Sequence, residues 1–263
     1  MKATVFIGGG RITSALITGL RLAKYSRPVM VHDRHPRKLQ QLKKQYDVLL
    51  EPDLARAVGA ADLLIVAVRP DSVHGLLKKI ERIARPLTAV SLAAGVPLKK
   101  LQAGLAQPVR WARAMPSPAS RSGQGLTALT FSRGLSRAAR RKVRDLFSLV
   151  GPVLEISERE FDAFTVTYST SHGYHALAAL VEAAEGIGLR RKNARIAGAH
   201  ALADGILTLR KSRLPLDHLL REAATPGGIA AAVMSELNRH GYQRVVARGL
   251  REGMKQARKN ARD

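Results

Sequence analysis

The chain has 263 residues, enough for one large domain or two modest ones, and 46% of them are hydrophobic, as in a packed globular protein. It has no cysteine, which excludes disulfides, thiolate metal sites and a cysteine nucleophile. The 44 Lys and Arg against 20 Asp and Glu give a formal net charge of +24. A charge of this size occurs in nucleic-acid-binding proteins, but the basic residues are dispersed along the chain. We interpret them as a solvated basic surface on an enzyme with an anionic cofactor, and we do not expect a nucleic-acid partner.

No apolar run reaches the roughly 18 to 20 residues of a membrane-spanning helix, so we expect no membrane partner. Met1-Lys2 leads straight into the first predicted strand, with no secretory signal before it. We therefore expect a soluble, cytoplasmic protein. The eight histidines lack H-E-x-x-H or a similar ligand spacing, and we predict no metal site.

The first elements in chain order are a strand, a glycine-rich turn and a helix. The apolar run at 3–7 breaks at Gly8-Gly9-Gly10, and apolar residues then recur from Ile12 with helical spacing. Gly8, Gly10 and Thr13 fill the three small-residue positions of the G-x-G-x-x-G/A fingerprint. The first position allows a tight turn, the second admits a pyrophosphate, and the third packs the helix on the strand. With the positive end of the helix behind it, this turn predicts a dinucleotide site.

A second predicted strand, 28–32, bears on the choice of cofactor. It ends at Asp33, about where a Rossmann unit places the residue that binds the ribose. Asp33 favours NAD because it accepts a hydrogen bond from a ribose 2′-hydroxyl and repels a 2′-phosphate. Arg34 and Arg37, with His35 between them, favour NADP because they can pair with that phosphate. We expect both cofactors to bind, with a slight preference for NADP.

Strand and helix patterns alternate up to about residue 157. The run 63–68 is apolar throughout and ends at Arg69-Pro70, as a buried parallel strand does at the carboxyl edge of a sheet. This alternation predicts an α/β fold, with a Rossmann-type parallel sheet covered by helices on both faces, over residues 1–157. Further strands are expected at 48–50, 88–92, 109–114, 126–131 and 153–156, and helices at 36–46, 53–58, 73–84 and 137–149.

Strand patterns disappear after residue 157. Helices are expected at 161–168, 174–187, 194–211, 215–223, 228–240 and 242–260. The segment 196–207 is apolar nearly all round, broken only by His200 and Asp204, so it is typical of a buried helix. About a hundred residues cannot bury such a helix alone. We therefore predict an all-helical dimerisation and substrate domain over residues 158–263, and a homodimer or higher homo-oligomer.

Six sequence motifs occur in a characteristic order along nearly the whole chain. They are Gly8-Gly9-Gly10-Arg11-Ile12, Ile65-Val66-Ala67-Val68-Arg69-Pro70-Asp71, Ser91-Leu92-Ala93-Ala94-Gly95-Val96, Arg113-Ala114-Met115-Pro116 with Gly123-Gln124-Gly125-Leu126-Thr127-Ala128-Leu129, Asp162-Ala163-Phe164-Thr165, and Thr225-Pro226-Gly227-Gly228. In this order they resemble the pyrroline-5-carboxylate reductases. The resemblance implies a Rossmann domain, a helical dimerisation domain, and hydride transfer from a nicotinamide cofactor to a cyclic imine. Reduction of pyrroline-5-carboxylate to proline is the default reaction.

The candidate cofactor residues come from the glycine-rich turn, the end of the second strand, and the loops that the resemblance implies. They are Gly8, Gly9, Gly10, Arg11, Ile12, Asp33, Arg34, Val68, Arg69, Pro70, Ala93, Ala94, Gly95, Met115 and Pro116.

The chain departs from the family pattern around the expected substrate. Where the family has S-G-S-G-P-A-Y, residues 168–174 read Y-S-T-S-H-G-Y and keep one serine-type position and the final tyrosine. Ser117 stands in place of an asparagine. Ala230 replaces a threonine that, by the resemblance, hydrogen-bonds the substrate nitrogen. These changes predict a divergent member with an altered substrate loop.

His172 and Tyr174 are the candidate catalytic residues. The pKa range of histidine suits acid–base work near neutrality, whereas the alternative for His172 is an exposed residue or a cap of a helix beginning near Gly173. Tyr174 is equally compatible with packing at a helix start. The candidate substrate-binding residues are Ser171, Thr225, Gly227 and Gly228, where backbone N–H groups at a helix start can hold a carboxylate. Thr225 is alternatively an N-cap before Pro226.

Two other functions stay open. A β-hydroxyacid-type dehydrogenase, or another imine reductase, fits the same architecture. The dehydrogenase uses a lysine four residues before an asparagine, a spacing that Lys192-Asn193 and the segment from Lys255 to Asn260 both miss. The second is a non-catalytic nucleotide-sensing or nucleic-acid-associated protein, suggested by the net charge and the altered loop.

Overall fold

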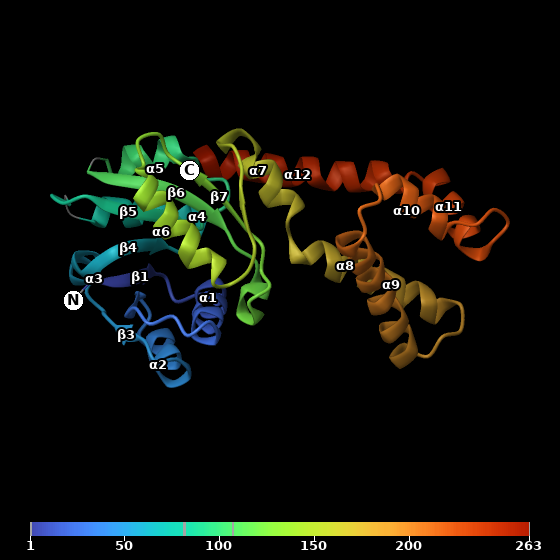
Figure 1. The fold of residues 1–263 in the computed structure, drawn as a ribbon, viewed down its shortest axis with the longest axis horizontal. Coiled ribbons are helices and arrows are strands. Elements are labelled where there is room, and N and C mark those ends of the chain that lie inside the picture. Colours follow the sequence, from blue (N-terminus) through green and yellow to red (C-terminus); the bar gives the residue numbers. More distant parts are fainter. Residues whose placement is uncertain (1, 81–82, 107, 263) are drawn as a thin grey trace. The chain divides into compact units, whose positions relative to one another are not determined.

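The computed structural model describes residues 2–80, 83–106 and 108–262. The chain divides into two compact units, drawn as ribbons in Figure 1. The first comprises residues 1–168 and 253–263, and the second comprises residues 169–252. The helix α7 (Glu158–Thr167) and the last part of α12 (Tyr242–Arg262) therefore group with the first unit. The division at residues 157 and 158 stays a prediction.

The first unit is built on one eight-stranded sheet, in the order β3-β2-β1-β4-β5-β6-β7-β8. Its strands are β1 (Ala3–Ile7), β2 (Val29–His32), β3 (Leu49–Leu50), β4 (Ala61–Val66), β5 (Leu87–Ser91), β6 (Val109–Met115), β7 (Thr127–Phe131) and β8 (Val153–Glu155). Strands β1 to β6 are parallel, which confirms the predicted Rossmann-type sheet.

The last two strands run the other way, because β7 pairs antiparallel with β6 and β8 pairs parallel with β7. A parallel neighbour needs a crossover of a dozen or more residues, usually a helix. Between β6 and β7 the chain has only the short 3₁₀ helix η1 (Pro118–Ser122), so it turns back instead of crossing over. The direction of β7 and β8 departs from the expected parallel sheet.

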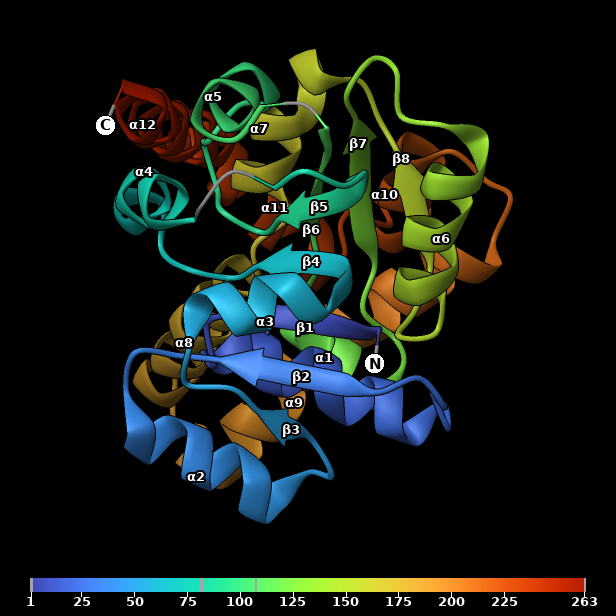
Figure 2. The ribbon, with the colours of Figure 1, turned by 90° about the vertical axis from the view of Figure 1, so that its left-hand side faces the viewer.

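Helices cover both faces of the sheet (Figure 2). One face packs against α3 (Leu54–Ala60), α4 (Pro70–Lys79) and α5 (Leu98–Gly104). The other packs against α1 (Arg11–Leu22), α2 (Pro36–Gln45) and α6 (Arg137–Ser148). Successive strand residues point to opposite faces, so Val5 joins the first of these cores and Phe6 joins the second. This explains why β1 and β4 are apolar at nearly every position.

Local capping decides where several helices begin and end. Asp53 is the N-cap of α3, and its carboxylate accepts a hydrogen bond from the Arg56 backbone N–H at 2.7 Å. The prediction of a helix at 73–84 was wrong at both ends. The helix α4 begins three residues earlier because Pro70 occupies its first position, where proline is favoured, and it ends at Lys79.

The second unit is helical throughout, which confirms the predicted loss of strands. It contains α8 (Thr170–Gly186), α9 (Arg191–Lys211), α10 (Leu216–Ala223), α11 (Ile229–Arg239) and the start of α12. The helices α8 and α9 pack closely at Gly198, where an added Cβ would lie 3.1 Å from Leu177 Cδ1. Within one chain only Ala194 and Gly198 of α9 are buried. Burial of the apolar segment 196–207 against a second subunit stays a prediction.

None of the helices in the described part of the chain combines the length and the apolar character that crossing a bilayer requires.

Candidate active site

The candidate cofactor residues lie on loops that leave one edge of the sheet. The ends of the parallel strands are in register, since Ile7 pairs with both His32 and Val66, and Val66 pairs with Ser91. The loops after β1, β2, β4, β5 and β6 therefore meet at the carboxyl edge. The strand order reverses between β1 and β4, and open α/β sheets bind ligands in the crevice at such a point.

Gly8 packs the first turn directly onto the end of β4. Its φ of +109° lies in the region that favours glycine, and an added Cβ would lie 2.6 Å from the carbonyl oxygen of Ala67. Thr13, at the third fingerprint position, is fully buried, and its hydroxyl donates to the Gly8 carbonyl oxygen at 2.6 Å. The threonine thus adds a hydrogen bond within the turn while still allowing the helix to pack.

Gly10 is the N-cap of α1 and leaves open space in front of the helix. A Cβ built on Gly10 meets no atom within 4 Å, and no side chain caps the helix. The first turn of α1 contains no acidic residue. Backbone N–H groups at such a helix start have no partner within the helix and attract anions. The turn therefore fits the pyrophosphate of a dinucleotide.

Asp33 lies at the end of β2 and holds the glycine-rich turn. One carboxylate oxygen accepts a hydrogen bond from the Gly9 N–H, and the other accepts one from the His35 N–H, both at 2.8 Å. Arg34 and Arg37 are exposed beside it. The structure therefore brings together the acidic and basic residues whose competition bears on cofactor choice.

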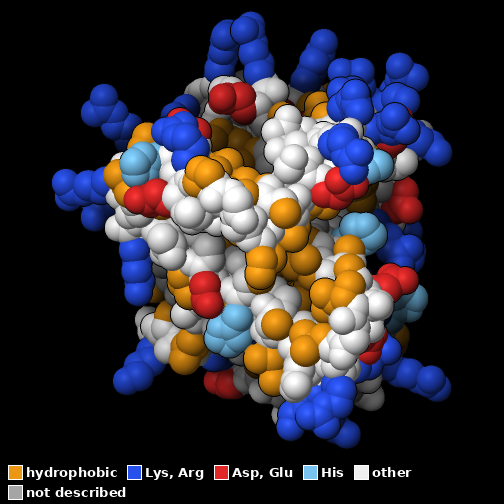
Figure 3. Space-filling model, turned by 90° about the vertical axis from the view of Figure 1, so that its right-hand side faces the viewer, with side chains coloured by type: hydrophobic (Ala, Val, Ile, Leu, Met, Phe, Trp, Pro, Cys, Tyr) orange, Lys and Arg blue, Asp and Glu red, His pale blue; other side chains and the backbone are white. Residues whose placement is uncertain are grey.

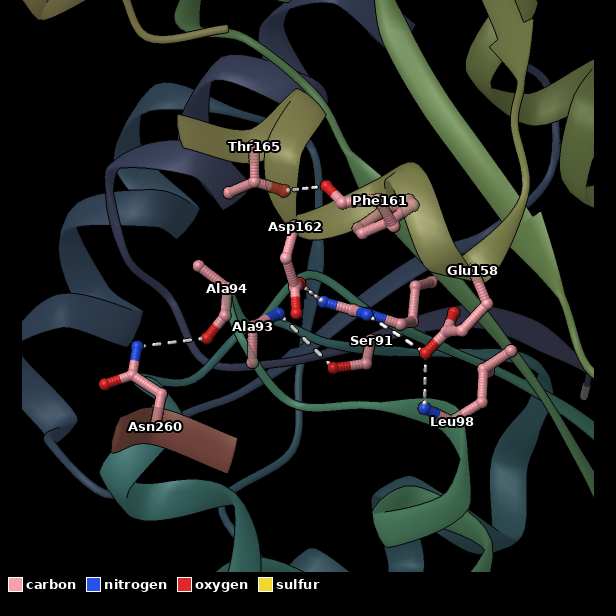
Figure 4. A network of polar contacts seen from close by, with 10 residues as sticks. Ser91, Ala93, Ala94, Leu98, Glu158, Phe161, Asp162, Thr165 and Asn260 are labelled. Atoms are coloured by element: carbon pink, nitrogen blue, oxygen red, sulfur yellow. Dashed lines mark hydrogen bonds and ion pairs between the residues drawn. The ribbon is translucent and has the colours of Figure 1, made fainter. Parts of the chain in front are cut away.

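The loop after β5 carries Ala93, Ala94 and Gly95, and Figure 4 shows how neighbouring side chains hold it. The Ala93 N–H donates to the buried hydroxyl of Ser91 at 3.2 Å. Asn260, from the last turn of α12, donates to the Ala94 carbonyl oxygen at 3.2 Å. No pattern in the sequence indicates that the end of the chain contacts this loop.

The strand β6, which ends at Met115 before Pro116, carries a buried arginine that forms two ion pairs with α7. Arg113 is 1% exposed, and its guanidinium contacts a Glu158 oxygen at 3.0 Å and an Asp162 oxygen at 2.6 Å (Figure 4). It also lies 4.3 Å from the centre of the Phe161 ring. The two ion pairs hold α7 on β6, because a buried guanidinium that lost its acidic partners would strongly destabilise the fold.

Sequence reasoning missed this network, although a signal was present. An arginine inside an apolar strand must find an acid, and Glu158 and Asp162 have the spacing of one helical turn, although the helix was expected to begin only at residue 161 and in fact begins at Glu158. Ser117, in place of the family's asparagine, is also buried, and its hydroxyl accepts from the Ala119 N–H at 3.0 Å at the start of η1.

Ser171, His172 and Tyr174 lie on the first turns of α8. The expected start near Gly173 was wrong, because Ser169 is the N-cap and the helix begins at Thr170. The Ser169 hydroxyl accepts from the Ser171 N–H at 3.3 Å, and the two hydroxyls are 2.7 Å apart. His172 is therefore a helix residue and does not cap this helix. Tyr174 is 70% exposed and does not pack at the helix start within one chain.

The candidate carboxylate-binding turn precedes α11. Gly228 is the N-cap of α11, no side chain caps that helix, and Gly227 adopts a φ of +75°. The Gly228 N–H donates to the Thr225 carbonyl oxygen at 2.9 Å. Thr225 is therefore part of the turn and is not the N-cap of α11. This turn and the α8 residues belong to the second unit, whereas all candidate cofactor residues belong to the first.

The chain is similar to known proteins over most of its length. The family profile described as "NADP oxidoreductase coenzyme F420-dependent" matches residues 4–95. The profile described as "Pyrroline-5-carboxylate reductase dimerisation" matches residues 158–260. A pyrroline-5-carboxylate reductase from Mycobacterium tuberculosis is 30% identical, and the match covers 94% of this chain and 92% of the relative.

Two solved structures share the fold over nearly the full length. The 1-pyrroline-5-carboxylate reductase from Streptococcus pyogenes superposes with a TM-score of 0.89 at 24% identity, covering 98% of each chain. The pyrroline carboxylate reductase from Plasmodium falciparum, solved with NADP bound, gives a TM-score of 0.88 at 20% identity, covering 99% of this chain and 98% of its own. Identity and coverage together show that the chain belongs to the pyrroline-5-carboxylate reductase family.

Proposed function

We propose that this protein is an NAD(P)H-dependent reductase that converts pyrroline-5-carboxylate to proline. The observation that carries the proposal is the match to a reductase of that name at 30% identity across 94% of the chain. The geometry supports it, because the candidate cofactor loops leave one carboxyl edge of a Rossmann-type sheet.

Different loops of the first unit bind different parts of the cofactor. The N–H groups at the start of α1 hold the pyrophosphate, and Gly10 leaves room for it. The reduced nicotinamide supplies a hydride to the carbon of the C=N bond. Residues after β4, β5 and β6 form the rest of the cofactor surface, and they include Val68, Ala94 and Pro116.

We infer a slight preference for NADP over NAD. Both oxygens of Asp33 already accept backbone N–H groups, which offset part of the repulsion between this carboxylate and a 2′-phosphate. Arg34 and Arg37 are exposed and can pair with that phosphate.

The substrate is assigned to residues of the second unit. The turn at Thr225, Gly227 and Gly228 leads into α11, and the backbone N–H groups that begin this helix hold the substrate carboxylate. His172 gives a proton to the ring nitrogen as the adjacent carbon receives the hydride, so the imine becomes a secondary amine. Ser171 and Tyr174, which lie with His172 on the first turns of α8, also contact the substrate.

A homodimer is part of the proposal. Figure 3 shows apolar side chains gathered on one face, with Lys and Arg around them. Large apolar residues of the second unit that are exposed within one chain include Tyr174, Ile187, Ile196, Ile206, Leu216, Ile229, Val233 and Val245. Exposed apolar patches of this extent mark protein–protein interfaces. Burial of these residues against a second copy accounts for the all-round apolar pattern of α9.

The deciding experiment is a substrate panel with purified protein and both reduced cofactors. Pyrroline-5-carboxylate should support oxidation of NADPH and, more weakly, of NADH, with proline as product. A six-membered cyclic imino acid serves as the size control, and 3-hydroxy acids with NADP test for a dehydrogenase. Turnover of a 3-hydroxy acid, with no oxidation of reduced cofactor by any cyclic imine, would contradict the proposal.

A further inference from the structure

The loop between β5 and α5 packs against the end of α12, far away in the sequence. Gly95 has a φ of +74°, and an added Cβ would lie 2.6 Å from the Ala257 carbonyl oxygen and 2.9 Å from Asn260 Cβ. Ala257 is 5% exposed. The loop backbone and the helix are thus in direct contact, with no space for a side chain between them.

Hydrogen bonds on both sides of this contact fix the end of α12. Gln256 Nε2 donates to Asn260 Oδ1 at 2.9 Å, which orients the amide so that Asn260 Nδ2 donates to the Ala94 carbonyl oxygen at 3.2 Å. From α5, Lys100 Nζ donates to the Ala261 carbonyl oxygen at 3.2 Å. A cation at the last carbonyls of a helix is also favoured by the helix dipole.

From these contacts we infer that Asn260 is a positioning residue for cofactor binding. It holds the Ala94 carbonyl, and residues 257–261 form the wall against which the loop 93–95 is shaped. The inference rests on the proposed function, which assigns this loop to the cofactor. All of these contacts lie within the first unit.

The test compares variants of this wall in the full-length protein. In Asn260→Asp, a nearly isosteric side chain loses the N–H donor and places an oxygen against the Ala94 carbonyl. Loss of one such hydrogen bond should raise the Kd for NADPH about 3- to 10-fold. The kcat at saturating cofactor should stay within about twofold, because Asn260 acts through the loop. Ala257→Leu, which pushes the loop away without changing its sequence, should raise the Kd in the same way.

Lys259→Ala is the matched control, because Lys259 is exposed on the same turn of α12. Titration of reduced-cofactor fluorescence at about 0.15 M salt, where exposed charges are screened, gives each Kd. A Kd for Asn260→Asp and Ala257→Leu equal to that of wild type, or an equal rise in Lys259→Ala, would overturn the inference. Wild type that binds neither NADPH nor NADH would instead overturn the proposed function and this inference with it.

Hydrogen exchange of the wild-type protein tests the same contact without any substitution. If the wall and the loop form one unit, NADPH should slow amide exchange in residues 257–261 as well as in 93–95. Slower exchange at 93–95 with unchanged exchange at 257–261 would also overturn the inference.

Discussion

The carboxylate of Asp33 accepts a hydrogen bond from the backbone N–H of Gly9 at 2.8 Å, so the end of β2 is tied to the turn after β1. Asp33 therefore shapes the glycine-rich turn, in addition to its proposed contact with the ribose. In Asp33→Asn the side chain keeps one acceptor oxygen, and its NH₂ group faces a backbone N–H. We predict weaker binding of both NADH and NADPH, about 3- to 10-fold, measured by fluorescence titration.

The double variant Arg34→Ala/Arg37→Ala is the matched comparison for Asp33→Asn, because it leaves the turn intact. This variant should weaken the binding of NADPH by about tenfold and leave the binding of NADH nearly unchanged, because only the NADP cofactor carries the 2′-phosphate. Equal losses for both cofactors would show that these arginines do not recognise that phosphate.

Gly8 and Gly10 should respond differently to the same substitution. Gly10→Val is expected to fold normally, because a Cβ there meets no atom within 4 Å and the φ of −82° suits any residue. It should nevertheless abolish cofactor binding, because the valine fills the space for the pyrophosphate. Gly8→Val should lower the free energy of unfolding instead, since its Cβ would lie 2.6 Å from the Ala67 carbonyl oxygen. Urea unfolding and cofactor titration of both variants check this contrast, and normal NADPH affinity in Gly10→Val would show that the site is misplaced.

The altered substrate loop is tested at His172 and Ala230. Loss of a positioned proton donor lowers the rate by about 10²- to 10⁴-fold, so His172→Ala should lose turnover by that factor and keep its Kd for NADPH. Ala230→Thr returns a hydroxyl to the first turn of α11 and should raise activity on pyrroline-5-carboxylate. Normal turnover in His172→Ala, with no gain in Ala230→Thr, would place the proton donor elsewhere, at solvent or at Tyr174.

The ion pair between Asp62 and Lys142 predicts that the stability of the protein depends on pH. The hydrogen bond from Lys142 lowers the pKa of the Asp62 carboxyl group below its ordinary value; burial opposes this shift, and Arg27 adds to it. A carboxyl group with a lower pKa in the folded state stabilises the protein above its unfolded pKa of about 3.9, and the effect is lost as pH falls through the folded value.

Asp62→Asn should therefore lower the free energy of unfolding by about 0.5 to 1 kcal/mol at pH 7, as expected for a partly exposed pair. The difference from wild type should largely disappear once the pH is well below the ordinary carboxyl pKa. Urea unfolding of wild type and variant, at pH 7 and at an acid pH, measures this difference in the free energy of unfolding. A difference that is the same at neutral and acid pH would contradict the assigned cause.

Local patterns were enough to predict most of the sheet and its cofactor edge. Buried parallel strands are apolar along their length, and the glycine-rich turn, α1 and Asp33 follow one another closely, so their contacts are nearly local. The N-cap at Ser169 was missed because several residues before Gly173 are compatible with a helix start. The direction of β7 depends on the absence of a crossover helix, which strand patterns alone do not show.

Long-range polar contacts could not be predicted in the same way. Arg113 meets Glu158 and Asp162 only after β6 and α7 have packed, and Asn260 meets Ala94 across most of the chain. An arginine in an apolar strand indicates that an acid must pair with it, but no periodicity identifies which acid. Asn260 alone is typical of an ordinary polar residue of a helix.

Gly19 in α1 has a consequence for how this protein can change over evolution. A Cβ at Gly19 would lie 2.1 Å from the Ser120 carbonyl oxygen, because α1 packs against η1 with backbone touching backbone. The helix α1, to which we assign the pyrophosphate, and the segment just after Pro116 are therefore in direct backbone contact. A change in substrate preference that moves the β6 loop displaces α1 as well, whereas substitutions at Thr225 and His172, in the second unit, leave this contact unchanged. New specificities in this lineage should therefore arise first around Thr225 and His172.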